Sequence, residues 1–499
     1  MLEFETQSGS MYAWDDEMGL FIPFSPTMKA VINEISNREL PLEKSIIERL
    51  GGDFEEEDIS FCYGWIKKWE KIEHKNQNAP AHSVIPQEDI KNYLLKNGFS
   101  HLILSVTEDC NFRCKYCIYS DYYEYTRGYS KNYMEFSIAK KAIDLYFSLL
   151  RMGMRYNPLR RPQIGFYGGE PLLNFELIKK SVEYVERKYG YFKTCYYNLT
   201  TNGSLLDKEK ADWLIQHNFS IAVSLDGPEE EHDRNRVYIN GKGTFKDIMK
   251  NIRPIMNSGF KDIFSIAIFN WKTDLFNLEE FFNRDDVPSL LQTTPVNKIG
   301  GTKYYEQFSE EDRSAFIKRY EDAMRYYMEH LHSQSLQSIQ ERPSFLYNLF
   351  GYRARVTFTQ PFSILSPCSI MPYTGGCVPG TKIFVSSDGN IYLCERVPEV
   401  NPFGNVKEGL NFEKIGQIVN DYIRHMDGCQ SCKVKKHCTN CYADFMTDKG
   451  FLYSSEICQG VEQSSLEAFA NVLAMAEINP EVIAPLDKSQ ENIKKYYGD

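Results

Sequence analysis

Three cysteines close together in the chain, Cys110, Cys114 and Cys117, restrict its chemistry more than any other feature of the sequence. They follow an apolar run, residues 102–106, that is typical of a β-strand. A strand that runs into a short loop would bring all three sulfurs to its C-terminal end. Three thiolates can hold a cubic iron–sulfur cluster and leave one iron open to a small molecule. A structural zinc site takes four protein ligands, and a cluster that only carries electrons takes four cysteines.

The spacing CxxxCxxC, with the aromatic residue Tyr116 before the last cysteine, resembles the signature of the radical S-adenosylmethionine (SAM) enzymes. The resemblance implies that the open iron binds the amino and carboxylate groups of SAM and that Tyr116 belongs to the cofactor site. It also implies that the reduced cluster cleaves SAM to methionine and a 5′-deoxyadenosyl radical, which abstracts a hydrogen atom from the substrate. A zinc site and three unrelated cysteines are the alternatives.

Strand-like and helix-like stretches alternate through residues 98–310, which predicts an α/β core with a parallel sheet and outer helices. Strands are expected near 101–106, 163–167, 194–200, 220–224, 262–269 and 289–294, and helices near 133–152, 173–189, 207–217, 244–258 and 274–284. The resemblance implies a partial (β/α)6 barrel. In barrels the reactive groups gather at the C-terminal ends of the strands.

Polar and glycine residues follow the second and third predicted strands. Gly168, Gly169 and Glu170 resemble the family's GGE motif, which implies that this segment holds the methionine amino group of SAM. Glycines there would let the backbone approach a ligand closely. Thr200 and Asn202 lie at the end of the third strand, where short polar side chains can form hydrogen bonds with a ribose or a substrate backbone.

The fourth predicted strand ends in SLDGP, followed by HDRNR, and these sequences contain Ser224, Asp226 and Arg236. Both pieces are similar to those of the SPASM branch of radical SAM enzymes, which includes anaerobic sulfatase-maturating enzymes and peptide maturases. The similarity implies that Ser224 and Arg236 contact the carboxylate end of SAM, a task that suits a bidentate guanidinium. An ordinary turn is the alternative for Asp226.

A second group of eight cysteines lies within residues 366–460: Cys368, Cys377, Cys394, Cys429, Cys432, Cys438, Cys441 and Cys458. It resembles the SPASM domain, which implies two auxiliary 4Fe–4S clusters and three clusters in the whole chain. The resemblance implies that Cys368, Cys377, Cys394 and Cys441 hold the first auxiliary cluster and that Cys429, Cys432, Cys438 and Cys458 hold the second. The spacing around Cys368 departs from the family, and without this ligand the first cluster would have an open iron. Zinc ribbons are the alternative.

Glu395 directly follows Cys394, at a position where the sulfatase-maturating enzymes have an aspartate as catalytic base. The resemblance implies that Glu395 accepts a proton as a substrate radical is oxidised. A salt bridge with Arg396 is the alternative role.

Residues 1–95 predict a hairpin over 11–24 and three helices, one from Ser25, one near 43–50 and one after the acidic residues 53–58. This arrangement is similar to the winged-helix-like domains that recognise leader peptides, which add an extended peptide to a sheet edge. A plain capping domain is the alternative. Residues 311–365 predict bridging helices, and residues 461–499 a C-terminal helix and tail.

The composition limits the cellular compartment and the class of partner. Eleven of the thirteen cysteines form two groups, which indicates metal ligands in a reducing compartment rather than disulfides. A net charge of −11 argues against nucleic acid as the main partner. The sequence has no signal peptide and no apolar run of the ~20 residues that would span a membrane, so a cytoplasmic location is expected.

Together these features predict a radical SAM/SPASM enzyme that installs oxidative cross-links, thioether or carbon–carbon, in a ribosomally synthesised precursor peptide with a leader. A flavodoxin- or ferredoxin-type protein is the expected electron donor. Oxidation of a cysteine or serine to formylglycine in a sulfatase is the alternative within this class. A zinc-bound peptide-binding scaffold is the alternative from another class.

Overall fold

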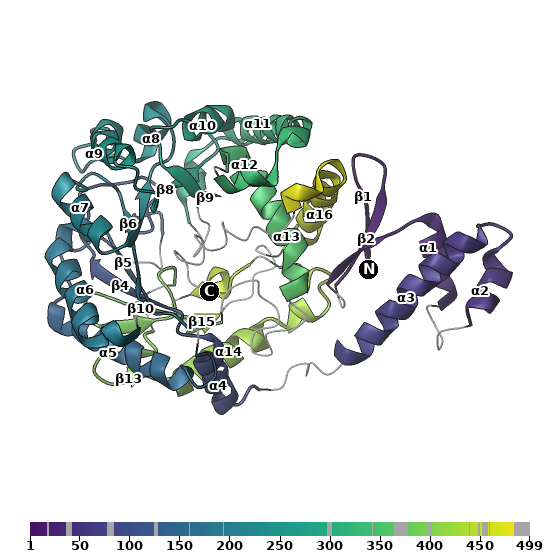
Figure 1. Ribbon diagram of the computed structural model, residues 1–499, viewed down its shortest axis with the longest axis horizontal. Helices are drawn as coiled ribbons and strands as arrows, with labels where there is room; N and C mark the ends of the chain where they lie inside the picture. The colour runs from purple at the N-terminus through teal and green to yellow at the C-terminus, as the bar shows by residue number, and fades with distance from the viewer. Residues whose placement is uncertain are drawn as a thin grey trace.

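A ten-stranded sheet, in the order β13-β12-β11-β10-β4-β5-β6-β7-β8-β9, lies inside the helices on the left of Figure 1. The structure is a computed structural model. It describes residues 1–16, 19–35, 42–76, 84–123, 128–158, 160–192, 194–296, 302–341, 343–363, 378–397, 399, 401–438, 440–447, 450–451, 458 and 460–483. Among these residues, no helix is both long enough and apolar enough to cross a bilayer.

Six parallel strands form the barrel that the sequence predicts: β4 (His101–Thr107), β5 (Gln163–Gly168), β6 (Tyr196–Thr201), β7 (Phe219–Ser224), β8 (Ile263–Phe269) and β9 (Ser289–Pro295). The helices that follow them are α5 (Phe136–Gly153), α6 (Phe175–Tyr189), α7 (Lys208–Gln216), α8 (Glu229–Asn235), α9 (Phe245–Asn257) and α10 (Leu275–Phe282). Figure 1 shows these helices around the outside of the sheet. Every residue of β4 is buried, as expected for a parallel strand that helices cover. The α/β class and the partial (β/α)6 barrel are confirmed, and only the short α8 was not predicted.

The sheet continues beyond β4 into the cysteine-rich part of the chain. Strand β10 (Lys382–Val385) pairs in parallel with β4, and β11 (Asn390–Tyr392), β12 (Gly404–Asn405) and β13 (Gly409–Leu410) follow it in antiparallel order. The sequence predicts a strand at 391–393, but it does not predict that β10 joins the barrel. A four-residue strand carries no local sequence signal for pairing with a strand far away in the chain. This pairing brings the segment before Glu395 to the edge of the barrel.

A separate three-stranded antiparallel sheet, in the order β1-β2-β3, begins the chain. Strands β2 (Met11–Asp15) and β3 (Leu20–Pro23) form the predicted hairpin, and β1 (Leu2–Glu5) was not predicted. The predicted helices are α1 (Pro26–Ile35), α2 (Glu43–Leu50) and α3 (Glu56–Asn76). They form one core with Ala13 and Ile22, and lie far to the right in Figure 1. The hairpin and the three helices expected for this segment are therefore present.

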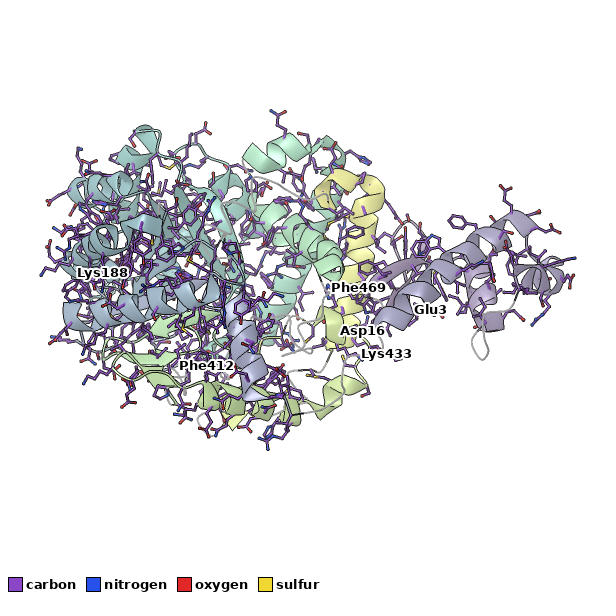
Figure 2. The ribbon with its side chains drawn as sticks, turned by 60° about the horizontal axis from the view of Figure 1, so that its bottom comes forward. Glu3, Asp16, Lys188, Phe412, Lys433 and Phe469 are labelled. Carbon is purple, nitrogen blue, oxygen red and sulfur yellow. The ribbon has the colours of Figure 1, made fainter. Side chains whose placement is uncertain are left out.

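The opposite face of the N-terminal sheet is also covered. Phe4 and Trp14 pack with Val434, Phe469 and Leu473 in a second apolar cluster. Phe469 and Leu473 belong to α16 (Val461–Ile478), the helix predicted near the C-terminus. Figure 2 shows Asp16 and Phe469 in the region where this sheet meets α16. Alternation along β2 therefore places Ala13 and Trp14 in apolar clusters on opposite faces of the sheet, whereas Glu3 and Glu5 of β1 are exposed.

The remaining helices join these parts. Helix α4 (Gln87–Asn97) lies before β4, and its buried residues Ile90, Leu94 and Leu95 pack in the barrel core, so the predicted boundary at residue 95 falls inside a barrel element. The bridging helices are α11 (Glu310–Glu329), α12 (Leu336–Glu341) and α13 (Tyr352–Ser363), and α14 (Phe412–His425) precedes a short hairpin of β14 (Met446–Thr447) and β15 (Gly450–Phe451).

Candidate active site

The loop after β4 holds the three cysteines and is fixed by backbone hydrogen bonds. Arg113 N donates to Val237 O (2.8 Å) and Lys115 N to Asn235 O (3.0 Å), so the loop pairs with the chain that leaves α8. The sulfurs accept weak hydrogen bonds: Cys110 Sγ from Phe112 N at 3.4 Å and Cys117 Sγ from Tyr119 N at 3.5 Å. Such donors favour sulfur that carries negative charge.

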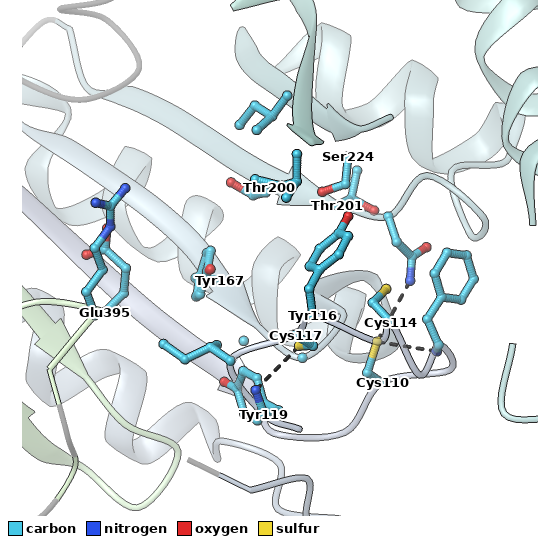
Figure 3. A pocket seen from close by; sticks show the side chains of 18 of the residues that line it. Cys110, Cys114, Tyr116, Cys117, Tyr119, Tyr167, Thr200, Thr201, Ser224 and Glu395 are labelled. Atoms are coloured by element: carbon cyan, nitrogen blue, oxygen red, sulfur yellow. Dashed lines mark hydrogen bonds between the residues drawn. The ribbon is translucent and has the colours of Figure 1, made fainter. Parts of the chain in front are cut away.

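All three cysteines line one cavity of about 320 Å³ inside the barrel (Figure 3). Burial raises the pKa of the Cys110 thiol strongly, and the nearby Glu170, Cys114 and Cys117 add to the shift. Burial also raises the pKa of Cys114 to about 12, although the Arg236 guanidinium opposes this shift. Three neighbouring thiols with one buried cation and an adjoining cavity fit the donor set of a 4Fe–4S cluster with one open iron. Among the described residues, no three histidine, cysteine or acidic side chains are spaced for a single metal ion.

Gly168 and Gly169 are required by the cysteine loop itself. A Cβ on Gly168, whose φ is +142°, would lie 2.1 Å from the carbonyl oxygen of Thr107, and one on Gly169 would lie 2.1 Å from that of Asp109. Gly169 N donates to Thr107 O at 2.8 Å, which holds the two strand ends together. The glycines therefore allow close contact between backbones, and both also line the cavity.

The Glu170 carboxylate is fully buried and accepts three hydrogen bonds from protein groups. Thr201 Oγ1 (2.7 Å) and Leu172 N (3.0 Å) donate to Oε1, and Asn202 N donates to Oε2 at 2.7 Å. Burial raises the pKa of Glu170 to about 7 in spite of these donors. Glu170 is not among the described residues that line the cavity. In this structure it fixes the end of β6, where Thr201 and Asn202 do line the cavity.

Asp226 has a similar internal role at the end of β7. Its Oδ2 accepts hydrogen bonds from Tyr116 Oη and from Arg236 Nε (2.9 Å), and its Oδ1 accepts from Ile268 N (3.0 Å). Asp226 N in turn donates to His232 Nδ1 at 3.2 Å. Asp226 therefore ties the cysteine loop, β8 and the chain after α8 together, which is more than an ordinary turn requires.

The side chains that face the cavity beside the cysteines come from neighbouring strand ends. Tyr116, Thr200, Asn202, Ser224 and Arg236 all line it, and Figure 3 shows Thr200, Ser224 and Tyr116 around the same space. The structure brings these predicted cofactor-binding residues together, and among them is the buried Arg236 guanidinium, whose Nε pairs with Asp226.

Glu395 lines the same cavity, on the opposite side from Cys110 in Figure 3. Lys382 Nζ lies 3.6 Å from Glu395 Oε1. Lys382, Arg396 and His101 outweigh burial and lower the pKa of Glu395 to about 2. The carboxylate is therefore ionised, lines the cavity and has Lys382 as its ion-pair partner.

His101 and Lys382 are cavity residues that sequence reasoning missed. They are partners in register at the beginning of β4 and β10. His101 Nε2 contacts Asn198 Nδ2 at 3.2 Å, and a Cβ on Gly165 would lie 2.6 Å from both His101 Nε2 and Asn198 Oδ1. In the sequence, His101 and Lys382 each stand directly before an apolar run, and this is the only local signal that they offer. The pairing of β4 with β10 is what makes the two residues neighbours.

The second group of cysteines is only partly described, since Cys368 and Cys377 lie outside the described residues. Burial, followed by the thiols of Cys438, Cys458 and Cys432, raises the pKa of Cys429 to about 12. Burial also raises the pKa of Cys438 to about 11, with Cys432 and Cys458 adding to the shift. The four cysteines expected at the second auxiliary cluster are therefore close to one another.

The loops after Cys394 and Cys441 also approach each other. Arg396 N donates to Cys394 Sγ at 3.4 Å, and Cys441 N donates to Asp444 Oδ2 at 2.7 Å. Burial raises the pKa of Asp444, and the Arg396 guanidinium partly offsets that shift, so the two loops lie within electrostatic reach.

Comparison with known proteins agrees with the geometry of the cysteine loop. A family model described as the radical SAM superfamily matches residues 104–274, which run from β4 to the loop before α10. The chain carries a radical SAM domain. The domain contains all three cysteines as well as Glu170, Asp226 and Arg236.

Curated relatives include anaerobic sulfatase-maturating enzymes. The cysteine-type enzyme of Clostridium novyi is 26% identical over 191 residues, which are 38% of this chain and 49% of that enzyme. The chain thus spans about half the length of this relative. A cysteine-type enzyme of Clostridium perfringens is 24% identical over 393 residues, 76% of this chain and 98% of that enzyme.

A solved structure of histidine-tagged anSMEcpe with bound AdoMet resembles this chain with a TM-score of 0.56 and 20% identity. The likeness covers 79% of this chain and 98% of the other, and it supports the fold alone. The radical SAM domain favours an enzyme over the zinc-bound scaffold and supports SAM and a 4Fe–4S cluster as cofactors.

Proposed function

We propose that this chain is a radical SAM peptide maturase, which installs oxidative cross-links, thioether or carbon–carbon, in a ribosomally synthesised precursor peptide. The observation that carries the proposal is the trio of thiols on one loop beside a cavity of about 320 Å³. Cys110, Cys114 and Cys117 would hold the SAM-binding 4Fe–4S cluster. With SAM bound, this cluster would supply the radical that removes a hydrogen atom from the substrate.

The chain's own residues orient the cofactor and handle protons. Arg236 is 7% exposed and would bind the carboxylate end of SAM, with Ser224 beside it. Asp226 would fix both Tyr116 and Arg236 in place. Glu395 would accept a proton as the substrate is oxidised, because it is ionised and lies across the cavity from the cysteines.

Two further 4Fe–4S clusters would accept an electron from the substrate or anchor it. Cys429, Cys432, Cys438 and Cys458 would hold one, which their mutual proximity supports. Cys368, Cys377, Cys394 and Cys441 would hold the other. A flavodoxin- or ferredoxin-type protein would deliver electrons to the SAM-binding cluster.

The N-terminal sheet would bind the leader of the precursor peptide. Apolar clusters pack on both faces of this sheet at β2 and β3, so we expect a peptide to add at an edge. Strand β3 pairs with β2 on one side, and no other described strand pairs with it on the other. Its second row of backbone donors and acceptors suits an extended peptide, as in other cases of strand addition.

Oxidation of a cysteine or serine to formylglycine is the second candidate function. Two observations favour it: a named sulfatase-maturating relative aligns over 98% of its length, and Glu395 lies in the cavity next to Cys394. The same cofactors would serve both reactions, so the product distinguishes the two.

The test uses the anaerobically reconstituted full-length protein, SAM, dithionite and a synthetic peptide encoded by a short reading frame next to the gene. We expect 5′-deoxyadenosine and a loss of two hydrogens per cross-link in the mass spectrum of the peptide. A different result would favour formylglycine formation over cross-linking. In that case the encoded peptide would stay unmodified, and a cysteine peptide from a sulfatase would gain an aldehyde. Cys114→Ala should form no 5′-deoxyadenosine, and normal formation by that variant would refute the cluster assignment.

A further inference from the structure

The N-terminal sheet contacts the cysteine loop 429–438 directly. Trp14 and Val434 are both 0% exposed in one apolar cluster, and Cys432 packs against the same cluster. The Trp14 ring lies 5.9 Å from the His437 ring in an edge-to-face arrangement and 4.9 Å from the Phe469 ring. The sheet expected to recognise a leader therefore also borders the four clustered cysteines. Trp14, Val434, His437 and Phe469 form one wall of this site.

This wall contains buried polar atoms for which the described residues provide no hydrogen-bond partner. Trp14 Nε1 and His437 Nε2 are both buried and make no hydrogen bond within that part of the chain. An indole N–H can only donate, and leaving one buried and unpaired costs about 1–3 kcal/mol. Native proteins rarely accept this cost, so the unpaired donor points to an acceptor that the described residues do not provide.

The charges around the wall are also specific. Asp16 directly follows β2, the strand that contains Trp14. Asp16 Oδ2 lies 4.0 Å from Nζ of Lys435, a residue between Cys432 and Cys438 in the cysteine loop, so the carboxylate lies beside this loop. One residue of the N-terminal segment thus brings a donor to this site, and another brings a negative charge.

We propose that the N-terminal sheet closes one side of the cluster site formed by Cys429, Cys432, Cys438 and Cys458, and that Trp14 donates its indole N–H to sulfur in that site. Trp14 and Asp16 are then positioning residues that set the reduction potential of this centre. The inference rests on the proposed function, because it needs an auxiliary cluster on these four cysteines. It assigns the N-terminal segment a second task besides peptide recognition.

The direction of each effect follows from charge. A hydrogen bond to sulfur stabilises the more negative, reduced cluster and raises its potential, whereas a nearby carboxylate lowers it. Trp14→Phe keeps the ring and removes the donor, so the midpoint potential should become more negative. Asp16→Asn removes the charge, so the midpoint should become more positive.

The experiment is an anaerobic redox titration of the reconstituted full-length protein, followed by electron paramagnetic resonance. The relevant signal is the one that Cys432→Ala abolishes. At a fixed ambient potential, the reduced fraction of this centre should fall severalfold in Trp14→Phe and rise in Asp16→Asn. The signal that responds to added SAM should keep its midpoint in both variants and serves as an internal control.

Phe4→Leu is the matched control for packing, since Phe4 belongs to the same apolar cluster but has no side-chain donor. It should leave the midpoint unchanged. An equal shift in Phe4→Leu and Trp14→Phe would overturn the proposal, as would unchanged midpoints in both Trp14→Phe and Asp16→Asn. If Trp14→Phe loses iron, the Asp16→Asn variant tests the proposal instead. A more positive midpoint in Asp16→Asn supports it, and an unchanged or more negative midpoint overturns it. Unchanged iron content and signals in Cys432→Ala would refute the auxiliary cluster instead.

Discussion

At the scale of single residues, the buried pair of Asp226 and Arg236 holds the candidate active site together. The two side chains are 2% and 9% exposed, and Asp226 also accepts hydrogen bonds from Tyr116 and from the backbone of Ile268. Removing one partner of such a pair leaves a buried charge uncompensated, which costs about 3–5 kcal/mol.

Asp226→Asn should therefore lower the thermal unfolding midpoint of the cluster-free protein markedly. The matched control is Asp286→Asn, which breaks ion pairs with Arg253 and Arg284 at a carboxylate that is 36% exposed. Such exposed pairs contribute at most about 1 kcal/mol. Equal melting temperatures for the two variants would mean that the buried pair has no special structural role.

Glu395 allows a test of proton transfer that leaves the cofactor site intact. General-base catalysis contributes about 10²–10⁴-fold to rate. Glu395→Gln should therefore form the modified peptide at least about 100-fold more slowly, while 5′-deoxyadenosine formation continues. Both products are quantified in the same reaction, and Glu395→Asp should recover part of the peptide modification. Parallel losses of both products in Glu395→Gln would contradict a role limited to the base.

Motifs identified the important residues of this site but not which of them face the cavity. Glu170 and Asp226 belong to recognisable motifs, yet both carboxylates are occupied by protein donors. Thr200, near the end of β6, and Ser224, from the same motif as Asp226, do line the cavity. A motif records that a residue type is needed, whereas burial and hydrogen-bond partners decide whether it touches a ligand or supports one that does.

At the scale of elements, the close contact between β5 and the cysteine loop depends on Gly169. A Cβ there would lie 2.1 Å from the backbone oxygen of Asp109, and backbone cannot move aside as a flexible side chain can. Gly169→Ala should displace the loop and reduce the iron bound at Cys110, Cys114 and Cys117. Iron analysis and the spectral change on adding SAM measure the effect.

Gly190→Ala is the control for this prediction. Gly190 ends α6, and a Cβ there would meet no atom within 4 Å. It should retain normal iron content and a normal response to SAM. A Gly169→Ala variant that behaved in the same way would show that the loop tolerates the side chain.

Element boundaries were predictable where local signals mark them. Helix α2 begins and ends at the predicted residues, and α1 begins at Pro26, where a proline suits the first turn. Strand β10 and helix α4 were not predicted. The partner of β10 is fixed by tertiary pairing with β4, and α4 is a short, mostly polar helix with only Ile90, Leu94 and Leu95 buried.

At the scale of the whole molecule, buried neutral histidines make the fold sensitive to acid. Burial lowers the pKa of both His101 and His232 to about 3, well below the ordinary value of 6.5. Below pH 6.5 the unfolded chain takes up protons at these residues and the folded chain does not. Their contribution to stability is therefore present above pH 6.5 and is lost as the pH falls toward 3.

Each of the two histidines should add a slope of up to about 1.4 kcal/mol per pH unit between pH 6.5 and 4. Denaturant midpoints of the cluster-free protein at pH 7 and pH 5 measure this slope. His232→Gln should reduce it, whereas His332→Gln, at an exposed position, should not. An unchanged slope in His232→Gln would place the acid sensitivity elsewhere.

The parallel pairing of β10 with β4 has a consequence for biosynthesis. β4, the strand that leads into the cysteine loop, lies between β5 and β10, and β10 is encoded in the last quarter of the chain. During translation the ribosome releases β4 and its three cysteines long before their second neighbour exists. β4 therefore keeps one open edge until β10 has been synthesised, and the sheet beside the cysteine loop can be completed only after that point.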